Sequence, residues 1–156
     1  MFNDLFGRIW RGRTPHPYHL NQGSIVSITE KIIENQILTY LTNKKIFAWK
    51  NHSQGTFDPG RKVFRKSRNV HHINGVSDIL GVIDGKFLAI EVKKPYISKK
   101  TMQFKYRTQE ELEKLASDDQ INFINRVKSL GGIAFFADSI DTVEDQLILH
   151  GAIASE

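Results

Sequence analysis

The chain has 156 residues, enough for one domain with a substantial hydrophobic core and too few for two ordinary ones. Its composition, 40% hydrophobic and 25% charged, is that of a globular protein, and no apolar run is long enough to span a bilayer. The absence of cysteine excludes disulfides, thiolate metal sites and cysteine nucleophiles. Lysine and arginine outnumber the acids by 22 to 17, which is compatible with a polyanionic partner. The N-terminus has no secretory-signal pattern, so we expect a cytosolic protein.

Residues 1–24 are predicted to form an arm distinct from a single domain over residues 25–156. Five apolar residues recur in the arm at helical spacing before Pro15 and Pro17 break the pattern: Phe2, Leu5, Phe6, Ile9 and Trp10. A short helix docked on its own domain or on a second subunit explains this pattern better than a membrane-surface anchor, which needs a longer basic amphipathic stretch.

The first half of the domain is predicted to contain one helix and one strand ahead of a polar segment. A capping box, Ser27-x-x-Glu30, precedes apolar residues at helical spacing and predicts a helix over residues 28–43. IFAWK at 46–50 is typical of a strand, with Phe47 and Trp49 expected to alternate between outward and inward positions. Residues 51–74 are interpreted as a polar, basic loop.

The second half is predicted to alternate helices and a strand after a basic loop at 94–107. Thr108-x-x-Glu111 and Ser117-x-x-Gln120 offer two helix starts, and Gly131-Gly132 ends the helical pattern. IAFFA at 133–137 indicates a strand buried on both faces, and Asp141-x-x-Glu144 is expected to begin a last helix over 141–150. The predicted class is therefore α/β, with a mixed central sheet flanked by helices.

A hairpin at residues 75–95, GVSDILGVIDGKFLAIEVKKP, carries the chemistry. Asp84-Gly85 predicts a two-residue turn, so Ile83 faces Lys86. Continuing that register places Asp78 opposite Glu91, with Lys93 on the same face. A bulge of one residue would instead separate the two acids onto opposite faces.

Two opposed carboxylates repel each other unless a proton or a cation lies between them. A divalent cation with few protein ligands and room for water, Mg²⁺ or Mn²⁺, suits such a pair. The alternative is that Lys93 neutralises a solvent-exposed pair at the end of the hairpin.

Ser77-Asp78 followed by Glu91-Val92-Lys93 resembles the PD-(D/E)XK nuclease superfamily. Together with TEKIIENQILTYL, FAWKN, Gln120 ahead of NFINRV, and GGIAFFADS, it resembles the virus-type replication-repair nuclease (VRR-NUC) domain over about residues 28–145. Two departures are Ser77, where the superfamily name has proline, and the long segment 94–117 before Gln120. The resemblance implies a restriction-endonuclease-like core.

The resemblance also implies roles for individual residues. Asp78 and Glu91 would bind the cation with the carbonyl of Val92, and Glu30 would reach it directly or through water. Lys93 would stabilise the attacking hydroxide or the charge on phosphorus, and Gln120 would orient Lys93 or a ligand. Glu30 and Gln120 have a rival explanation as the second residues of the capping boxes begun by Ser27 and Ser117.

Basic side chains on both sides of the hairpin are the candidate DNA contacts. They are Arg61, Lys62, Arg65, Lys66, Arg68, His72, Lys94, Lys99 and Lys100. The alternative is that they belong to solvated loops. The adjacent His71 and His72 lack a third ligand and do not predict a zinc site.

The predicted function is a metal-dependent endonuclease of branched or structured DNA. The resemblance implies an origin in a phage or mobile element, hence the cytoplasm of a host cell, and a role in replication or DNA repair. Alternatives are a DNA-binding module that keeps the nuclease fold without turnover, and a protein-assembly platform. Because two-fold pairing suits a symmetric junction, we also expect a homodimer.

Overall fold

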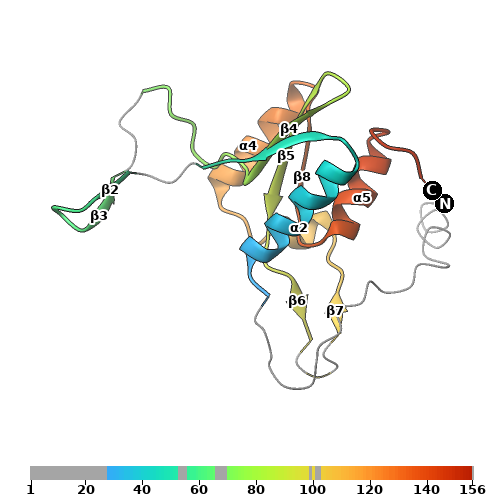
Figure 1. The fold of residues 1–156 in the computed structure, drawn as a ribbon, viewed down its shortest axis with the longest axis horizontal. Coiled ribbons are helices and arrows are strands. Elements are labelled where there is room, and N and C mark those ends of the chain that lie inside the picture. The colour runs from blue at the N-terminus through green and yellow to red at the C-terminus, as the bar shows by residue number, and fades with distance from the viewer. Residues whose placement is uncertain (1–27, 53–55, 66–69, 99, 101–102, 156) are drawn as a thin grey trace.

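The structure is a computed structural model that describes residues 28–52, 56–65, 70–98, 100 and 103–155 (Figure 1). The predicted arm at 1–24 lies outside the described residues.

A four-stranded sheet forms the centre of the fold, in the order β1-β4-β5-β8. It consists of β1 (Phe47–Lys50), β4 (Ile79–Ile83), β5 (Lys86–Val92) and β8 (Ile133–Ala137). β4 is antiparallel to both β1 and β5, and β8 runs parallel to β5. The predicted mixed sheet is therefore confirmed.

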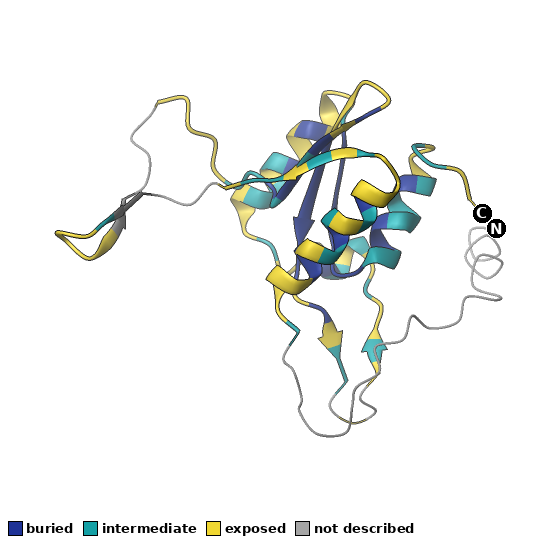
Figure 2. Ribbon diagram, in the orientation of Figure 1, coloured by how far each residue is buried: buried dark blue, intermediate teal, exposed yellow. Residues whose placement is uncertain are grey.

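Helices cover both faces of this sheet (Figures 1 and 2). α2 (Glu30–Asn43) and α5 (Ile140–Leu149) enclose one core with residues such as Ile79, Ile90 and Phe135. α3 (Gln109–Glu113) and α4 (Asp118–Ser129) enclose a smaller core around Ala89 and Phe136 on the opposite face. The α/β class is confirmed. In the described part of the chain, no helix has the length and apolar character needed to cross a membrane.

Two short antiparallel ribbons lie in the segments predicted as loops. β2 (Thr56–Asp58) pairs with β3 (Val63–Arg65), and β6 (Tyr96–Ile97) pairs with β7 (Phe104–Lys105). Figure 1 shows the two ribbons projecting from the central sheet in different directions. The prediction of loops over 51–74 and 94–107 is thus wrong at these residues, because strands of two or three residues are too short to leave a periodic pattern.

Two predicted helix starts are wrong and two are confirmed. α2 is capped by Thr29, whose side chain accepts the N–H of Ile32, so the helix begins at Glu30 rather than at residue 28; Ser27 lies outside the described residues. α5 is capped by Ser139 rather than Asp141. α3 and α4 begin with the predicted capping boxes, and Gly131, with φ +85°, follows the end of α4.

The hairpin has the predicted register. Asp84 and Gly85 have φ of 49° and 73°, as a type I′ turn requires, and the pairs run from Ile83–Lys86 to Ile79–Ile90 without a bulge. Asp78, one residue before β4, adjoins the end of β5: its carboxyl accepts the N–H of Val92, and its charge acts on Glu91.

The prediction that Phe47 and Trp49 alternate across β1 is wrong. Both are exposed, and their ring centroids lie 5.3 Å apart. Residues two apart on a strand share a face, and here the alternating partner is Ala48, which packs on the core beneath α2 and α5.

Candidate active site

The predicted catalytic residues meet at one end of the sheet, where β4 begins and β5 ends. Asp78 precedes β4 and is partly buried, whereas Glu91 and Lys93 are only 2% and 6% exposed. On the other side of β4, the N–H of Asn51 donates to the carbonyl of Asp78 (2.7 Å). Burial of Glu91 and Lys93, both of which contact Gln120 of α4, contradicts the alternative of a solvent-exposed pair.

Asp78 is held by the opposite strand. Its Oδ2 accepts the backbone N–H of Val92 (2.9 Å). Burial raises the pKa of Asp78 above its ordinary value, and the charges of Glu34 and Glu30 raise it further, against the lowering effects of the Val92 N–H and Lys93. Asp78 is thus a carboxyl whose ionised form is disfavoured unless a positive charge is near.

Glu91 has the most perturbed titration of the site. Burial, followed by the charge of Asp78, raises the pKa of Glu91 to about 7, although Lys93 acts in the opposite direction. Its Oε1 lies 3.2 Å from Lys93 Nζ, and its Oε2 is buried with no hydrogen-bond partner. One oxygen of a buried carboxylate is therefore available to a ligand.

Gln120, at the start of α4, connects Lys93 to Glu91. Its Oε1 accepts from Lys93 Nζ (3.0 Å), and its Nε2 donates to Glu91 Oε1. The same Oε1 accepts the N–H of Ser117 (3.0 Å) and so completes the capping box. The two explanations offered for Gln120 are therefore not exclusive, since a carbonyl oxygen has two lone pairs.

Gly75 fixes the spacing between α4 and the segment that leads to Asp78. It has φ +69°, and a β-carbon built on it would lie 2.2 Å from the backbone of Asp119. Only glycine allows this approach, which brings Gln120 against the end of β5.

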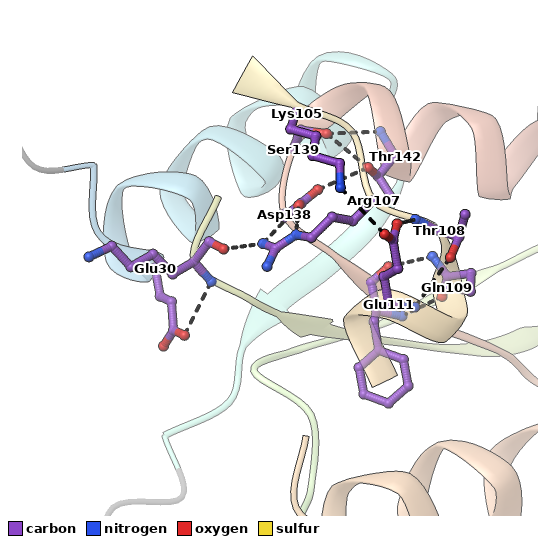
Figure 3. A network of polar contacts seen from close by, with 11 residues as sticks. Glu30, Lys105, Arg107, Thr108, Gln109, Glu111, Asp138, Ser139 and Thr142 are labelled. Atoms are coloured by element: carbon purple, nitrogen blue, oxygen red, sulfur yellow. Dashed lines mark hydrogen bonds and ion pairs between the residues drawn. The ribbon is translucent and has the colours of Figure 1, made fainter. Parts of the chain in front are cut away.

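Glu30 and Arg107 hold the residue that follows Lys93. Glu30 Oε1 accepts the N–H of Lys94 (3.2 Å), and the guanidinium of Arg107 donates to the carbonyl of Lys94. Figure 3 shows Arg107 pointing between that carbonyl and Asp138, whose Oδ2 accepts from Arg107 Nε (3.0 Å). The sequence predicted Glu30 but not Arg107 or Asp138.

Glu34, Asn51 and Ser77 are further polar residues of this region that the sequence reasoning missed. Glu34 follows Glu30 by one helical turn, is 7% exposed, and its Oε1 lies 2.5 Å from Lys50 Nζ without the angles of a hydrogen bond. The Nδ2 of Asn51 and the Oγ of Ser77 are buried. The spacing of two acids four residues apart on α2 was the available signal.

Asp78, Glu91 and the carbonyl of Val92 are the residues able to hold a cation here. In the described residues, no group of three or more His, Asp or Glu side chains is arranged to hold a metal ion. Glu30, whose Oε1 is engaged by Lys94, is not gathered with Asp78 and Glu91 into such a group. Two carboxylates plus water still match the way Mg²⁺ is bound in proteins.

Of the predicted DNA-binding residues, Arg61 and Lys62 lie between β2 and β3, Lys100 lies between β6 and β7, and Lys94 follows Lys93. Arg61, Lys62, His72, Lys94 and Lys100 are exposed. Arg65 ends β3, but its side chain lies outside the description, as do Lys66, Arg68 and Lys99.

A comparison with protein-family models finds no match, and a search of curated proteins finds none similar to this chain. The resemblance to the VRR-NUC domain therefore rests on the motif residues alone.

Proposed function

We propose that this chain is a metal-dependent endonuclease with a restriction-endonuclease-like core that cleaves phosphodiester bonds in branched or structured DNA. Asp78, Glu91 and Val92 hold Mg²⁺ or Mn²⁺, and Lys93 acts on the scissile phosphate. The assignment to the VRR-NUC domain and a homodimeric assembly are parts of the same proposal.

One observation carries the proposal: the buried polar atoms without a hydrogen-bond partner gather at one place. Within the ranges the structure describes there are four, Glu34 Oε1, Asn51 Nδ2, Ser77 Oγ and Glu91 Oε2, of which Glu34 Oε1 has a counter-charge in Lys50. The other three belong to neighbours of Asp78: the N–H of Asn51 donates to its carbonyl, Ser77 precedes it, and Glu91 lies close enough for the charge of Asp78 to raise its pKa. Such groups are costly unless water, an ion or a substrate satisfies them.

The charge at the same place also favours a divalent cation. Four carboxylates, Glu30, Glu34, Asp78 and Glu91, act on one another there, whereas two lysines pair with Glu34 and Glu91. Two negative charges are therefore uncompensated when every group is ionised, and a divalent cation balances them.

Each residue has a task that follows from its position. When bound, the metal supplies a water of lowered pKa and neutralises the phosphate. Lys93, paired with Glu91 and aimed by Gln120, donates to the phosphate oxygen on which negative charge develops. The hydrogen bonds of Lys94 to Glu30 and Arg107 fix the backbone after Lys93 and so restrict where its ammonium can lie.

A cleavage assay tests the proposal directly. The protein is incubated with end-labelled junction, flap, duplex and single-stranded DNA in Mg²⁺, Mn²⁺ or EDTA. We expect internal cuts in the branched substrates with either metal and none in EDTA. Tight binding with no product under any metal would instead assign the chain to the class of non-catalytic DNA-binding modules.

The β2–β3 ribbon provides a second prediction, about binding rather than cleavage. Neutralising Arg61, Lys62, Arg65 and Lys66 together should weaken binding to all DNA forms alike and reduce the slope of log K against log salt by roughly 3, because each phosphate contact releases counterions. Titrations at several salt concentrations in EDTA measure this.

The matched control neutralises four exposed cations, Lys31, Arg126 and Lys128 on helices and Lys114 directly after α3, which changes the net charge equally. We expect it to retain a slope near that of the wild type. Equal slopes for both variants would show that the ribbon contributes only to the overall charge.

A further inference from the structure

Half of one sheet face is left open beside the candidate active site. α3 and α4 pack on β5 and β8, and the rest of that face, on β1, β4 and the start of β5, retains exposed apolar side chains. Phe47 is 71% exposed, and Trp49, Val82 and Phe87 are each about 40% exposed. We call these four residues the open sheet face. Contiguous exposed apolar groups of this kind usually mark a binding surface.

The open sheet face is continuous with the candidate active site. Trp49 pairs with Leu80, two residues along β4 from Asp78, and Phe47, Val82 and Phe87 form the next row of the sheet. Strand spacing and rise place the α-carbon of Trp49 roughly 8 Å from that of Asp78. Alternation along β5 puts Phe87 on the same face as Glu91 and Lys93. A nucleic acid strand that left Glu91 and Lys93 in the direction of β1 would pass Trp49 and then Phe47.

Positive charge lies at the far end of this path. Lys45 is exposed two residues before Phe47. Lys86 pairs with Ile83 and therefore lies on the opposite face of the sheet, which α2 and α5 cover. The order from the candidate cation site is thus two aromatic rings and then Lys45. These groups are complementary to a nucleic acid strand, whose phosphates favour the lysine and whose bases stack on aromatic side chains.

We propose that Phe47 and Trp49 stack against unpaired bases of a DNA strand whose phosphate lies at the Glu91–Lys93 site. The proposal rests on the proposed nuclease function and specifies its substrate class: DNA with unpaired nucleotides next to the cut, such as a flap or a single-stranded branch. A fully paired duplex offers no free base face to these rings.

Tryptophan fluorescence tests this stacking without requiring cleavage. The chain has two tryptophans, so Trp10→Phe leaves Trp49 as the sole reporter. In EDTA we expect a thymidine oligonucleotide and a flap to quench Trp49 fluorescence, and a blunt duplex of equal length to leave it nearly unchanged.

Substitutions distinguish stacking from simple apolar contact. In the otherwise wild-type chain, Trp49→Tyr and Phe47→Tyr keep a planar ring and should retain binding of single-stranded DNA within about threefold, whereas Trp49→Leu and Phe47→Leu should weaken it roughly tenfold. Leu149→Ala, at an exposed apolar residue of α5, is the control and should bind like the wild type. Melting temperatures verify that all variants fold.

The outcomes separate this proposal from the nuclease proposal. Equal quenching by duplex and single strand, or equal binding by the tyrosine and leucine variants, would overturn stacking while leaving cleavage intact. A change in oligomeric state for the leucine variants in sedimentation would assign the open sheet face to protein association and also overturn it. Quenching that requires the rings, without cleavage in any metal, would support stacking and remove the nuclease function.

Discussion

Lys93→Ala should abolish DNA cleavage and leave DNA binding close to that of the wild type. The lysine is 6% exposed, and its ammonium contacts Glu91 and Gln120, so it is positioned to act on charge that develops during reaction rather than on ground-state affinity. Loss of one such donor lowers rates by roughly 100-fold or more. Single-turnover cleavage and binding in EDTA measure the two effects.

A pH series distinguishes loss of the lysine from an indirect effect on Glu91. Lys93 lowers the pKa of Glu91, so its removal raises that pKa and protonates a proposed metal ligand. If this were the only effect, activity of Lys93→Ala would recover at pH 9. We expect no recovery. Lys128→Met, which removes one exposed charge from α4, should cleave normally, and retention of more than a few per cent of the rate by Lys93→Ala would remove Lys93 from the mechanism.

The hairpin was predictable because its turn and its period fix it locally. Asp84-Gly85 sets the register, and alternation then places Asp78 with Glu91 and Lys93 on one face. Nothing outside the hairpin is needed for this step. The parallel strand β8 was predictable as a buried strand, but its position beside β5, with Phe136 opposite Glu91, depends on the packing of α3 and α4.

Residues with two roles were harder to predict than residues with one. Gln120 fits a capping box in the sequence, and a contact with Lys93 was expected from the resemblance alone. That one amide makes both contacts depends on the close approach of Gly75 to α4. A charged residue at the position of Glu34 on α2 would ordinarily face solvent, but Glu34 is buried. Its burial follows from the packing of α2 on the sheet, where Lys50, the last residue of β1, lies opposite.

Asp78→Asn tests the cation site through stability as well as activity. Asparagine can still accept the N–H of Val92 through its Oδ1, so the hydrogen bond is retained while the negative charge is lost. At pH 8 in EDTA we therefore expect the variant to melt at the same temperature as the wild type or a few degrees higher.

The direction of this difference in melting temperature follows from the raised pKa of Glu91. A carboxyl whose pKa rises from 4.5 unfolded to about 7 folded stabilises the fold fully below pH 4.5 and loses that contribution as pH rises through 7. The charge of Asp78 raises the pKa of Glu91, so replacing Asp78 with asparagine lowers that pKa. The fold then loses less stability as the pH rises. The advantage of Asp78→Asn should thus be present at pH 8 and shrink below pH 5.

Adding metal should reverse this difference in melting temperature, so that the wild type becomes more stable than Asp78→Asn. A cation that binds only the folded wild type at 100 times its dissociation constant adds about 2.7 kcal/mol. We expect millimolar Mg²⁺ or Mn²⁺ to raise the melting temperature of the wild type by several degrees, to have little effect on Asp78→Asn, and to support cleavage by the wild type alone.

Asp84→Asn makes the same chemical change at the exposed turn of the same hairpin and should respond to metal like the wild type. A wild type whose melting is indifferent to saturating Mn²⁺ would contradict the assignment of Asp78, Glu91 and Lys93 as a metal-dependent catalytic site.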